Sequence, residues 1–195
     1  FHDPTLDRVT NYKGKIRDFT SQELKKIRVN DKFQIPFLED LLDSFSQNYF
    51  SIDMKSDESV IPLIKLVRKM NAIDRVCFAS FNQQRLDYVR EEFSNKCISS
   101  MGPKEIVKTK LCSIFNIKHN VLPLISSLPI ERYKIELLNK KHVDFLKSLN
   151  IKVIAWTIND ANEITRLIDL GVDGIMTDKI SALKEILIKK NLWQH

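Results

Sequence analysis

Two short segments of the sequence combine residue types that can act on a charged substrate. His2 and Asp3 are adjacent in FHDPTLDRVTNYKGK, and an imidazole beside a carboxylate is a familiar acid–base arrangement. Asp53 and Lys55 stand two residues apart in YFSIDMK. Because alternate side chains lie on the same face of a strand, this carboxylate and this ammonium group would face the same space. An anionic substrate could meet the lysine there.

Each of these residues also has an ordinary structural alternative. His2 could be a solvated histidine in a frayed terminus. Asp53 could cap the next helix from the end of its strand, and Lys55 could be a surface lysine. Which role applies depends on the strands and loops on which these residues lie.

Short apolar runs alternate with amphipathic segments beyond residue 45, a pattern typical of parallel βα units. The predicted strands are YFSIDM (49–54), RVCFAS (75–80), the weaker CISSM (97–101), KVIAWT (152–157) and GIMTD (174–178). Polar or aromatic residues gather where these strands end. They are Asp53, Lys55, Ser80, Trp156 with Asn159, Thr177 and Asp178.

Helices with readable ends lie between the strands. One is predicted over Ser59–Met70, one after the cap Asn82, one over Asn139–Leu149, and one from Asp160 to the stop at Gly171. A capping box at Thr20 predicts a short helix near the start of the chain.

These elements predict an α/β fold, and the polar strand ends favour a TIM (β/α)8 barrel over an open doubly wound sheet. Three of the four strand-to-strand spacings lie between 22 and 26 residues, but 55 residues separate Cys97 from Lys152. We interpret residues 102–138 as an inserted, loop-like segment. Five strands leave roughly three of eight units unaccounted for, so we expect a fragment that starts at the end of the third strand, at HDPT.

Composition narrows the class of protein. The 195 residues are 43% hydrophobic and 29% charged, as in a globular domain with a core. The net charge of +6 fits an anionic partner, but lysines and arginines are scattered among acids, which argues against a nucleic-acid groove. No apolar run is long enough to cross a bilayer. The unpaired spacing of Cys77, Cys97 and Cys112 indicates reduced, buried thiols and a cytoplasmic protein.

Five segments, in order, resemble the glycerophosphodiester phosphodiesterase family. FHDPTLDRVTNYKGKIRDFTSQEL resembles the family's HDxTLxRTTxxxGxxxDxTxxEL, and IPFLEDLLDSF resembles IPTLEEVL. YFSIDMK is similar to LNIEIK, and FASFNQQRLDYVR to SSFDPEALRRVR. The last two units of the family are matched by IKVIAWTINDANEITRLIDLGVDGIMTD. The resemblance covers essentially the whole chain and implies a TIM barrel over residues 1–195.

The resemblance implies hydrolysis of small glycerophosphodiesters to glycerol 3-phosphate and an alcohol, assisted by Ca²⁺ or Mg²⁺. This chemistry needs charge neutralisation at the phosphoryl oxygens and a proton for the leaving oxygen. A hard cation held by carboxylates can supply the first, and a histidine can supply the second.

The resemblance assigns roles to five residues. His2 matches one of the family's two catalytic histidines, and Asp53 takes the place of a metal-binding Glu that is one methylene longer. Lys55 would meet the phosphate, Trp156 would pack on the glycerol moiety, and Phe81 would form pocket wall. The remaining histidines, His119, His142 and His195, have no motif partner, and His142 is interpreted as structural.

The family's His-Arg motif and its Glu-x-Asp metal ligands would lie before residue 1, so we do not expect a complete site within this sequence. A non-catalytic barrel of the same family, acting as a binding or regulatory module, is the alternative. Asp53 in place of Glu would be one sign of it.

Overall fold

A computed structural model describes residues 1–193 of the chain. The chain divides into two compact units, Phe1–Asn48 and a larger unit that begins at Tyr49. Within residues 1–193, no helix is both long enough and apolar enough to span a bilayer.

The first unit consists of short elements around a small core. They are η1 (Ile16–Asp18), α1 (Ser21–Lys26), the antiparallel pair β1 (Arg28–Val29) and β2 (Phe33–Gln34), and α2 (Leu38–Ser44). Leu6, Ile27 and Ile35 form the core. The predicted capping box is confirmed, because Thr20 accepts from the Glu23 amide while the Glu23 carboxylate accepts from the Thr20 amide.

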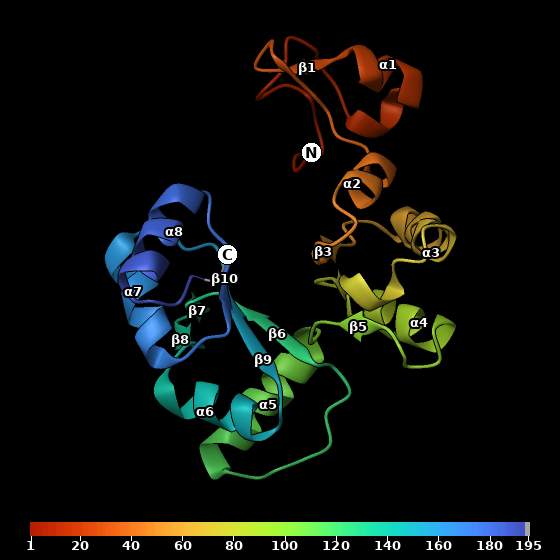
Figure 1. Cartoon of the computed structure of the whole chain (residues 1–195). Helices are drawn as coiled ribbons and strands as arrows, with labels where there is room; N and C mark the ends of the chain where they lie inside the picture. The colour runs from red at the N-terminus through yellow and green to blue at the C-terminus, as the bar shows by residue number, and fades with distance from the viewer. Residues whose placement is uncertain (194–195) are drawn as a thin grey trace. The chain divides into compact units, whose positions relative to one another are not determined.

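Six parallel strands form the framework of the second unit (Figure 1). They are β3 (Phe50–Asp53), β4 (Val76–Ala79), β5 (Ile98–Ser99), β6 (Ile125–Leu128), β9 (Lys152–Ala155) and β10 (Gly174–Ile175). One sheet has the order β3-β4-β5 and the other β6-β9-β10. A single parallel bridge, Ser100 to Ile125, joins β5 to β6, so neighbours in space follow the order of the chain.

Helices connect successive strands and lie outside them (Figure 1). They are α3 (Val60–Lys69) with η2 (Asp57–Ser59) before it and η3 (Ile73–Arg75) after it, α4 (Gln83–Glu92), α5 (Pro103–Phe115), α6 (Lys140–Ser148), α7 (Ala161–Leu170) and α8 (Ile180–Lys189). The predicted caps Asn82, Asn139 and Asp160 each accept from a first-turn amide. Gly171 ends α7 at φ +93°, a conformation that glycine adopts without strain.

The interpretation of residues 102–138 as an inserted loop is wrong. They contain α5, β6 and a hairpin of β7 (Glu131–Arg132) and β8 (Ile135–Glu136). The segment lacks the usual apolar pattern because several of its buried positions are polar: Thr109 and Ser113 face inward on α5, and Ser126 is buried in β6. The 55-residue gap is thus two ordinary βα units.

The number of parallel strands in the structure is larger than the number predicted from the sequence. Six parallel strands in chain order leave room for two more in an eight-stranded barrel, not three. Residues 1–4 form no strand, and they belong to the first unit, so the interpretation of HDPT as the end of a third strand is not supported. The parallel α/β architecture is confirmed, and the strands of residues 1–193 do not close into a barrel.

Arg90 connects three elements of the second unit from a buried position on α4. Its Nε donates to Ser99 Oγ at 2.9 Å and one Nη donates to the Ser100 carbonyl at 2.9 Å, both at the end of β5. Its two Nη atoms contact the Glu105 carboxylate of α5 at 2.8 and 3.0 Å. Glu105 also accepts from the Gly102 amide at 2.7 Å. One guanidinium therefore fixes the passage from β5 into α5.

We expect Arg90→Ala to lower the free energy of unfolding by about 3 kcal/mol or more, because it leaves Glu105 partly buried without its partner. Arg90→Lys should not restore stability, since a single ammonium cannot donate in the same fork. Urea denaturation measures both. The control is Arg166→Ala, whose exposed pair with Glu163 should contribute less than about 1 kcal/mol. Equal losses for Arg90→Ala and the control would contradict this role.

His142 is buried in α6, as the sequence predicted for a structural histidine. Its Nδ1 donates to the Leu137 carbonyl at 2.8 Å, and Nε2 is buried without a hydrogen-bond partner. Burial lowers the pKa of His142 from 6.5 to about 4, with a smaller contribution from Lys110, although the Leu137 carbonyl favours the charged form. The folded protein thus holds a neutral imidazole.

This burial predicts a pH dependence of stability. The unfolded chain takes up a proton near pH 6.5 and the folded chain only near pH 4, so stability is lost as pH falls through this window. The loss attributable to His142 should be at most roughly 3 kcal/mol. His142→Asn keeps a donor for Leu137 and should flatten the profile between pH 6.5 and 4 in urea titrations. An unchanged profile would show that His142 does not cause it.

Candidate functional site

Asp53 and Lys55 meet at the carboxyl end of β3. Lys55 Nζ lies 2.9 Å from Asp53 Oδ2, and the side chains are 58% and 28% exposed, respectively. The structure therefore brings together the two residues that the sequence predicted on one face. Because the pair is open to solvent, an incoming anion can contact the ammonium group without displacing a packed side chain.

Main-chain contacts hold the end of β3 in place. The Met54 amide donates to the Ala79 carbonyl of β4 at 2.8 Å. The Met54 carbonyl accepts from Ser80 Oγ at 3.0 Å and from Arg85 at 2.8 Å. Ser80, a predicted rim residue, is buried and ties two strand ends together, so its observed role is structural.

Phe81 and Trp156 form an aromatic contact at the same edge. Their ring centroids are 5.7 Å apart and the rings are nearly perpendicular, at 86°. Phe81 follows β4 and Trp156 follows β9, and β5 and β6 lie between those strands. Rings from such distant strands can touch only if the wall curves and its carboxyl ends converge. The two predicted pocket residues are thus brought together as in a barrel mouth.

Arg132 and Tyr133, from the β7–β8 hairpin, extend this aromatic group. The Arg132 guanidinium lies 5.4 Å from the Phe81 centroid and 5.2 Å from that of Tyr133, within the range of a cation–π contact. The sequence did not predict them. The two central hairpin residues, Tyr133 and Lys134, take positive φ without the Asn-Gly or Asp-Gly pair that normally signals such a turn.

Asn159, Thr177 and Asp178 connect the last two strand ends. Asn159 Oδ1 accepts from Thr177 Oγ1 at 3.0 Å and from the Asp178 amide at 2.9 Å, while Asn159 Nδ2 donates to Asp178 Oδ2 at 2.9 Å. These three predicted rim residues satisfy one another, which indicates that they shape the loops after β9 and β10.

His2 lies in the first unit and is exposed. Its Nδ1 is 3.0 Å from Asp3 Oδ1, and Asp3 Oδ2 accepts from Arg8 Nε at 2.5 Å. The Arg8 hydrogen bond, followed by that of His2, lowers the pKa of Asp3 to about 2. The carboxylate therefore stays charged at neutral pH and orients the imidazole through Nδ1.

The described residues do not provide a divalent-metal site by themselves. In residues 1–193, no group of three His, Cys, Asp or Glu side chains is arranged to hold an ion. Asp53 is the predicted ligand, and one of its oxygens is engaged by Lys55. The donor set present here thus does not fit a Ca²⁺ or Mg²⁺ cage, which needs several oxygen ligands.

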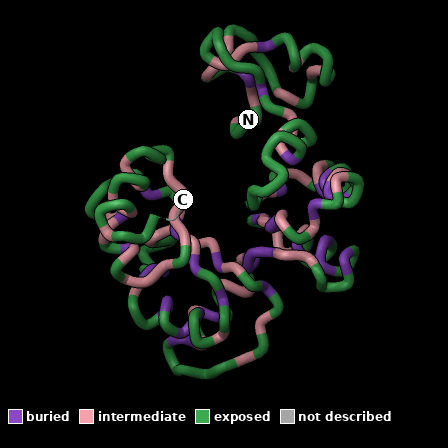
Figure 2. The backbone as a smooth tube through the Cα atoms, in the orientation of Figure 1, coloured by how far each residue is buried: buried purple, intermediate pink, exposed green. Residues whose placement is uncertain are grey.

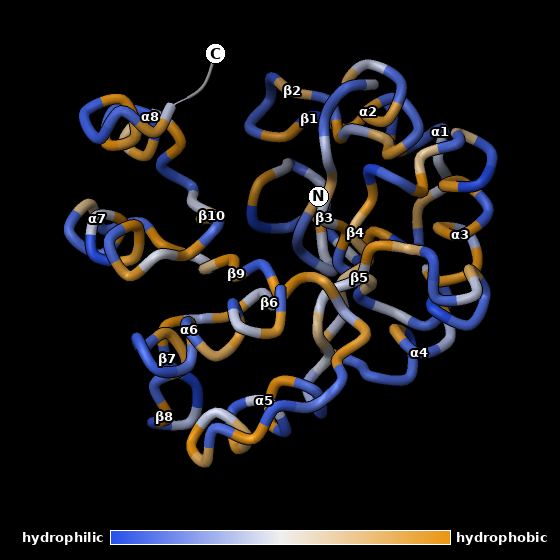
Figure 3. The backbone as a smooth tube through the Cα atoms, turned by 60° about the horizontal axis from the view of Figure 1, so that its bottom comes forward, coloured by the Kyte–Doolittle hydropathy of each residue, from blue (hydrophilic) through white to orange (hydrophobic). Residues whose placement is uncertain are grey.

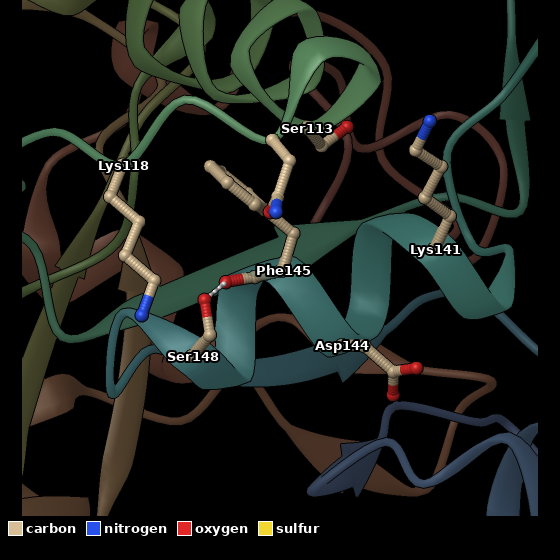
Figure 4. A pocket seen from close by; sticks show the side chains of 7 residues that line it. Ser113, Lys118, Lys141, Asp144, Phe145 and Ser148 are labelled. Atoms are coloured by element: carbon tan, nitrogen blue, oxygen red, sulfur yellow. Dashed lines mark hydrogen bonds between the residues drawn. The ribbon is translucent and has the colours of Figure 1, made fainter.

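The three cysteines and the residues that line the pocket in Figure 4 are not among the candidate site residues. Cys77 is buried, which raises its pKa to about 12, and Cys97 and Cys112 are only partly buried free thiols. A pocket of about 460 Å³ lies between α6 and the end of α5, and no predicted site residue lines it (Figure 4). The reactive-site candidates therefore remain those at the carboxyl strand ends and at His2.

Comparison with known proteins identifies relatives of the chain. A glycerophosphodiester phosphodiesterase of Caldanaerobacter subterraneus is 28% identical over 203 residues, covering 96% of this chain and 79% of the relative. A glycerophosphodiester phosphodiesterase structure from Agrobacterium tumefaciens has a TM-score of 0.71 at 17% identity, over 95% of this chain and 78% of that one.

An Oleispira antarctica phosphodiesterase, solved in complex with sn-glycerol-3-phosphate, has a TM-score of 0.73 at 18% identity, over 96% of this chain and 78% of that one. These likenesses show the fold. The model of the glycerophosphoryl diester phosphodiesterase family matches residues 1–182, nearly the whole chain. The chain therefore belongs to the glycerophosphoryl diester phosphodiesterase family.

Proposed function

We propose that this protein hydrolyses glycerophosphodiesters to glycerol 3-phosphate and an alcohol, as a step in phospholipid and glycerol metabolism. The observation that carries the proposal is the family match over residues 1–182. Its relatives named glycerophosphodiester phosphodiesterase, and the product bound to the Oleispira antarctica enzyme, support this substrate class.

The carboxyl edge of the second unit supplies groups suited to such a substrate. Lys55 offers an exposed ammonium group for a phosphoryl oxygen, which lowers the repulsion that a phosphodiester anion presents to a nucleophile. Phe81 and Trp156 offer apolar ring surface for the carbon skeleton of glycerol. A phosphodiester anion joined to a glycerol skeleton, whose C–H groups can pack on a ring face, matches this pair of features.

His2 is proposed as a general acid or base of the reaction. Proton transfer to the leaving alkoxide oxygen, or from the attacking water, is the assistance that an imidazole can give. Asp3 holds the ring through Nδ1 and, remaining ionised, stabilises the imidazolium when it forms. Asp3 is therefore a positioning residue for His2.

We also propose that activity depends on a divalent ion and that Asp53 is one of its ligands. Binding of the ion would require further oxygen ligands, because residues 1–193 contain no group of three His, Cys, Asp or Glu side chains arranged to hold it. Asp53 would hold the ion as one carboxylate ligand among several, and Lys55 would contact the phosphate.

Asp53→Asn and Lys55→Met separate these roles. If Asp53 is a ligand, Asp53→Asn should raise the Mg²⁺ or Ca²⁺ concentration for half-maximal hydrolysis by roughly tenfold or more, because a cage loses one formal charge. Lys55→Met should raise KM and leave the metal titration unchanged. Steady-state kinetics across metal concentrations measures both. If Asp53→Asn changes only KM, then Asp53 orients Lys55 and is no ligand.

His2→Ala should lower kcat by roughly 10²- to 10⁴-fold on a glycerophosphodiester with a poor leaving group, the range for loss of acid–base assistance. The defect should shrink on a nitrophenyl ester if His2 is the acid. Lys13→Ala, an exposed change in the same segment, is the control. Equal losses on both substrates would assign His2 to the base or to positioning. Full activity of the variant on both substrates would show that His2 is a solvated histidine with no part in the reaction.

A further inference from the structure

Helix α5 has an inverted distribution of polar and apolar residues. Its inward positions include Thr109 and Ser113, both buried. Its outward positions hold large apolar side chains that are each at least 50% exposed: Val107, Leu111, Ile114 and Phe115. Spacings of four, three and one residues place these side chains along one face, which we call the α5 stripe.

The loop after α5 continues the exposed apolar surface. Ile117, Leu122 and Leu124 are each more than half exposed. Figure 2 shows this connection as largely exposed, and Figure 3 shows hydrophobic stretches on α5 and beyond it. Contiguous apolar surface of this kind marks an interaction site more often than scattered exposed residues do.

The charges within the segment that carries the stripe have one sign, and the acids beside it, Glu136 and Asp144, lie next to Lys110 and Lys140. Residues 106–130 contain no Asp or Glu and three lysines, Lys108, Lys110 and Lys118. Lys104 and Lys108 are exposed at the start of α5, and Lys118 is exposed just after its end. Glu105, the one acidic residue of the helix, accepts hydrogen bonds from both Nη atoms of Arg90. A partner that fits this face therefore combines an apolar layer with negative charge.

We propose that α5 and the loop after it bind the surface of an anionic lipid bilayer. An amphipathic helix that lies in the interface buries its apolar face among acyl chains while its lysines reach the headgroups. A second copy of the chain fits less well. A two-fold contact through this face would set its lysines against those of the partner, with no acid in residues 106–130 to pair with them, and the nearby Glu136 and Asp144 already face lysines of their own chain.

The lipid-binding face lies away from the candidate site. Because β5 and β6 are parallel, α5 runs back toward their amino ends, and the loop after it reaches β6 at that end. Lys55, Phe81 and Trp156 lie at the opposite, carboxyl ends. Lipid binding would thus anchor the second unit and leave those residues facing water.

Sedimentation with vesicles tests the proposal in the purified protein. Wild type should bind phosphatidylcholine vesicles containing about 30 mol% phosphatidylserine, bind pure phosphatidylcholine much less, and dissociate near 0.5 M salt, because screening removes the headgroup attraction. Leu111→Ser with Phe115→Ser should reduce binding to background. Lys104→Gln with Lys108→Gln should weaken partitioning by roughly fivefold per lysine.

Matched controls are Ile61→Ser and Lys65→Gln on α3, both exposed positions, and they should bind as wild type does. Equal thermal midpoints of all variants show that they are folded. The proposal is wrong if wild type does not bind vesicles that contain phosphatidylserine, or if the α5 variants bind them as well as the α3 controls do. A dimer in analytical ultracentrifugation that the Leu111/Phe115 variant abolishes would instead assign the face to self-association and overturn the lipid proposal.

Discussion

The fork of hydrogen bonds from Arg90 to Glu105 is the constraint on which the second unit depends. It joins α4, the end of β5 and the first turn of α5 in one buried arrangement. Helix α5 leads into β6, and β6 pairs with β9, the next strand of the second sheet. A buried charge is costly unless it is paired and fully hydrogen-bonded, so this junction has one strongly preferred geometry.

Sequence reasoning predicted those parts of the fold whose signals are local. Helix caps such as Thr20 and Asp160 need only nearby residues, and β4 is a continuous buried run. It missed α5 and β6 because Thr109, Ser113 and Ser126 occupy positions where apolar residues normally reveal the period. Arg90 was also beyond prediction, since its partners Ser99, Ser100 and Glu105 lie 9 to 15 residues away and become neighbours only in the folded chain.

In the candidate site, too, the sequence predicted local contacts and missed contacts between distant segments. Asp53 and Lys55 were predictable as a pair because strand alternation alone places them together. Contact between Phe81 and Trp156 required the curvature of the whole wall, and Arg132 required a hairpin with no standard turn residues. His2 lies in a segment that resembles the family motif, and its contact with Asp3, which Arg8 holds from the other side, adds a local reason for its orientation.

The bridge between Ser100 and Ile125 has a consequence for motion. Neighbouring strands within each three-stranded sheet share two or four paired residues, whereas the two sheets meet through this one bridge, which includes the bond from the Met101 amide to the Ile125 carbonyl. Few shared hydrogen bonds make such a seam the place where a structure opens at low free energy. Phe81 stands on one side of it and Trp156 on the other. Opening of the main-chain hydrogen bonds at this seam would separate the two rings, so the pairing of β5 with β6 controls the contact between Phe81 and Trp156.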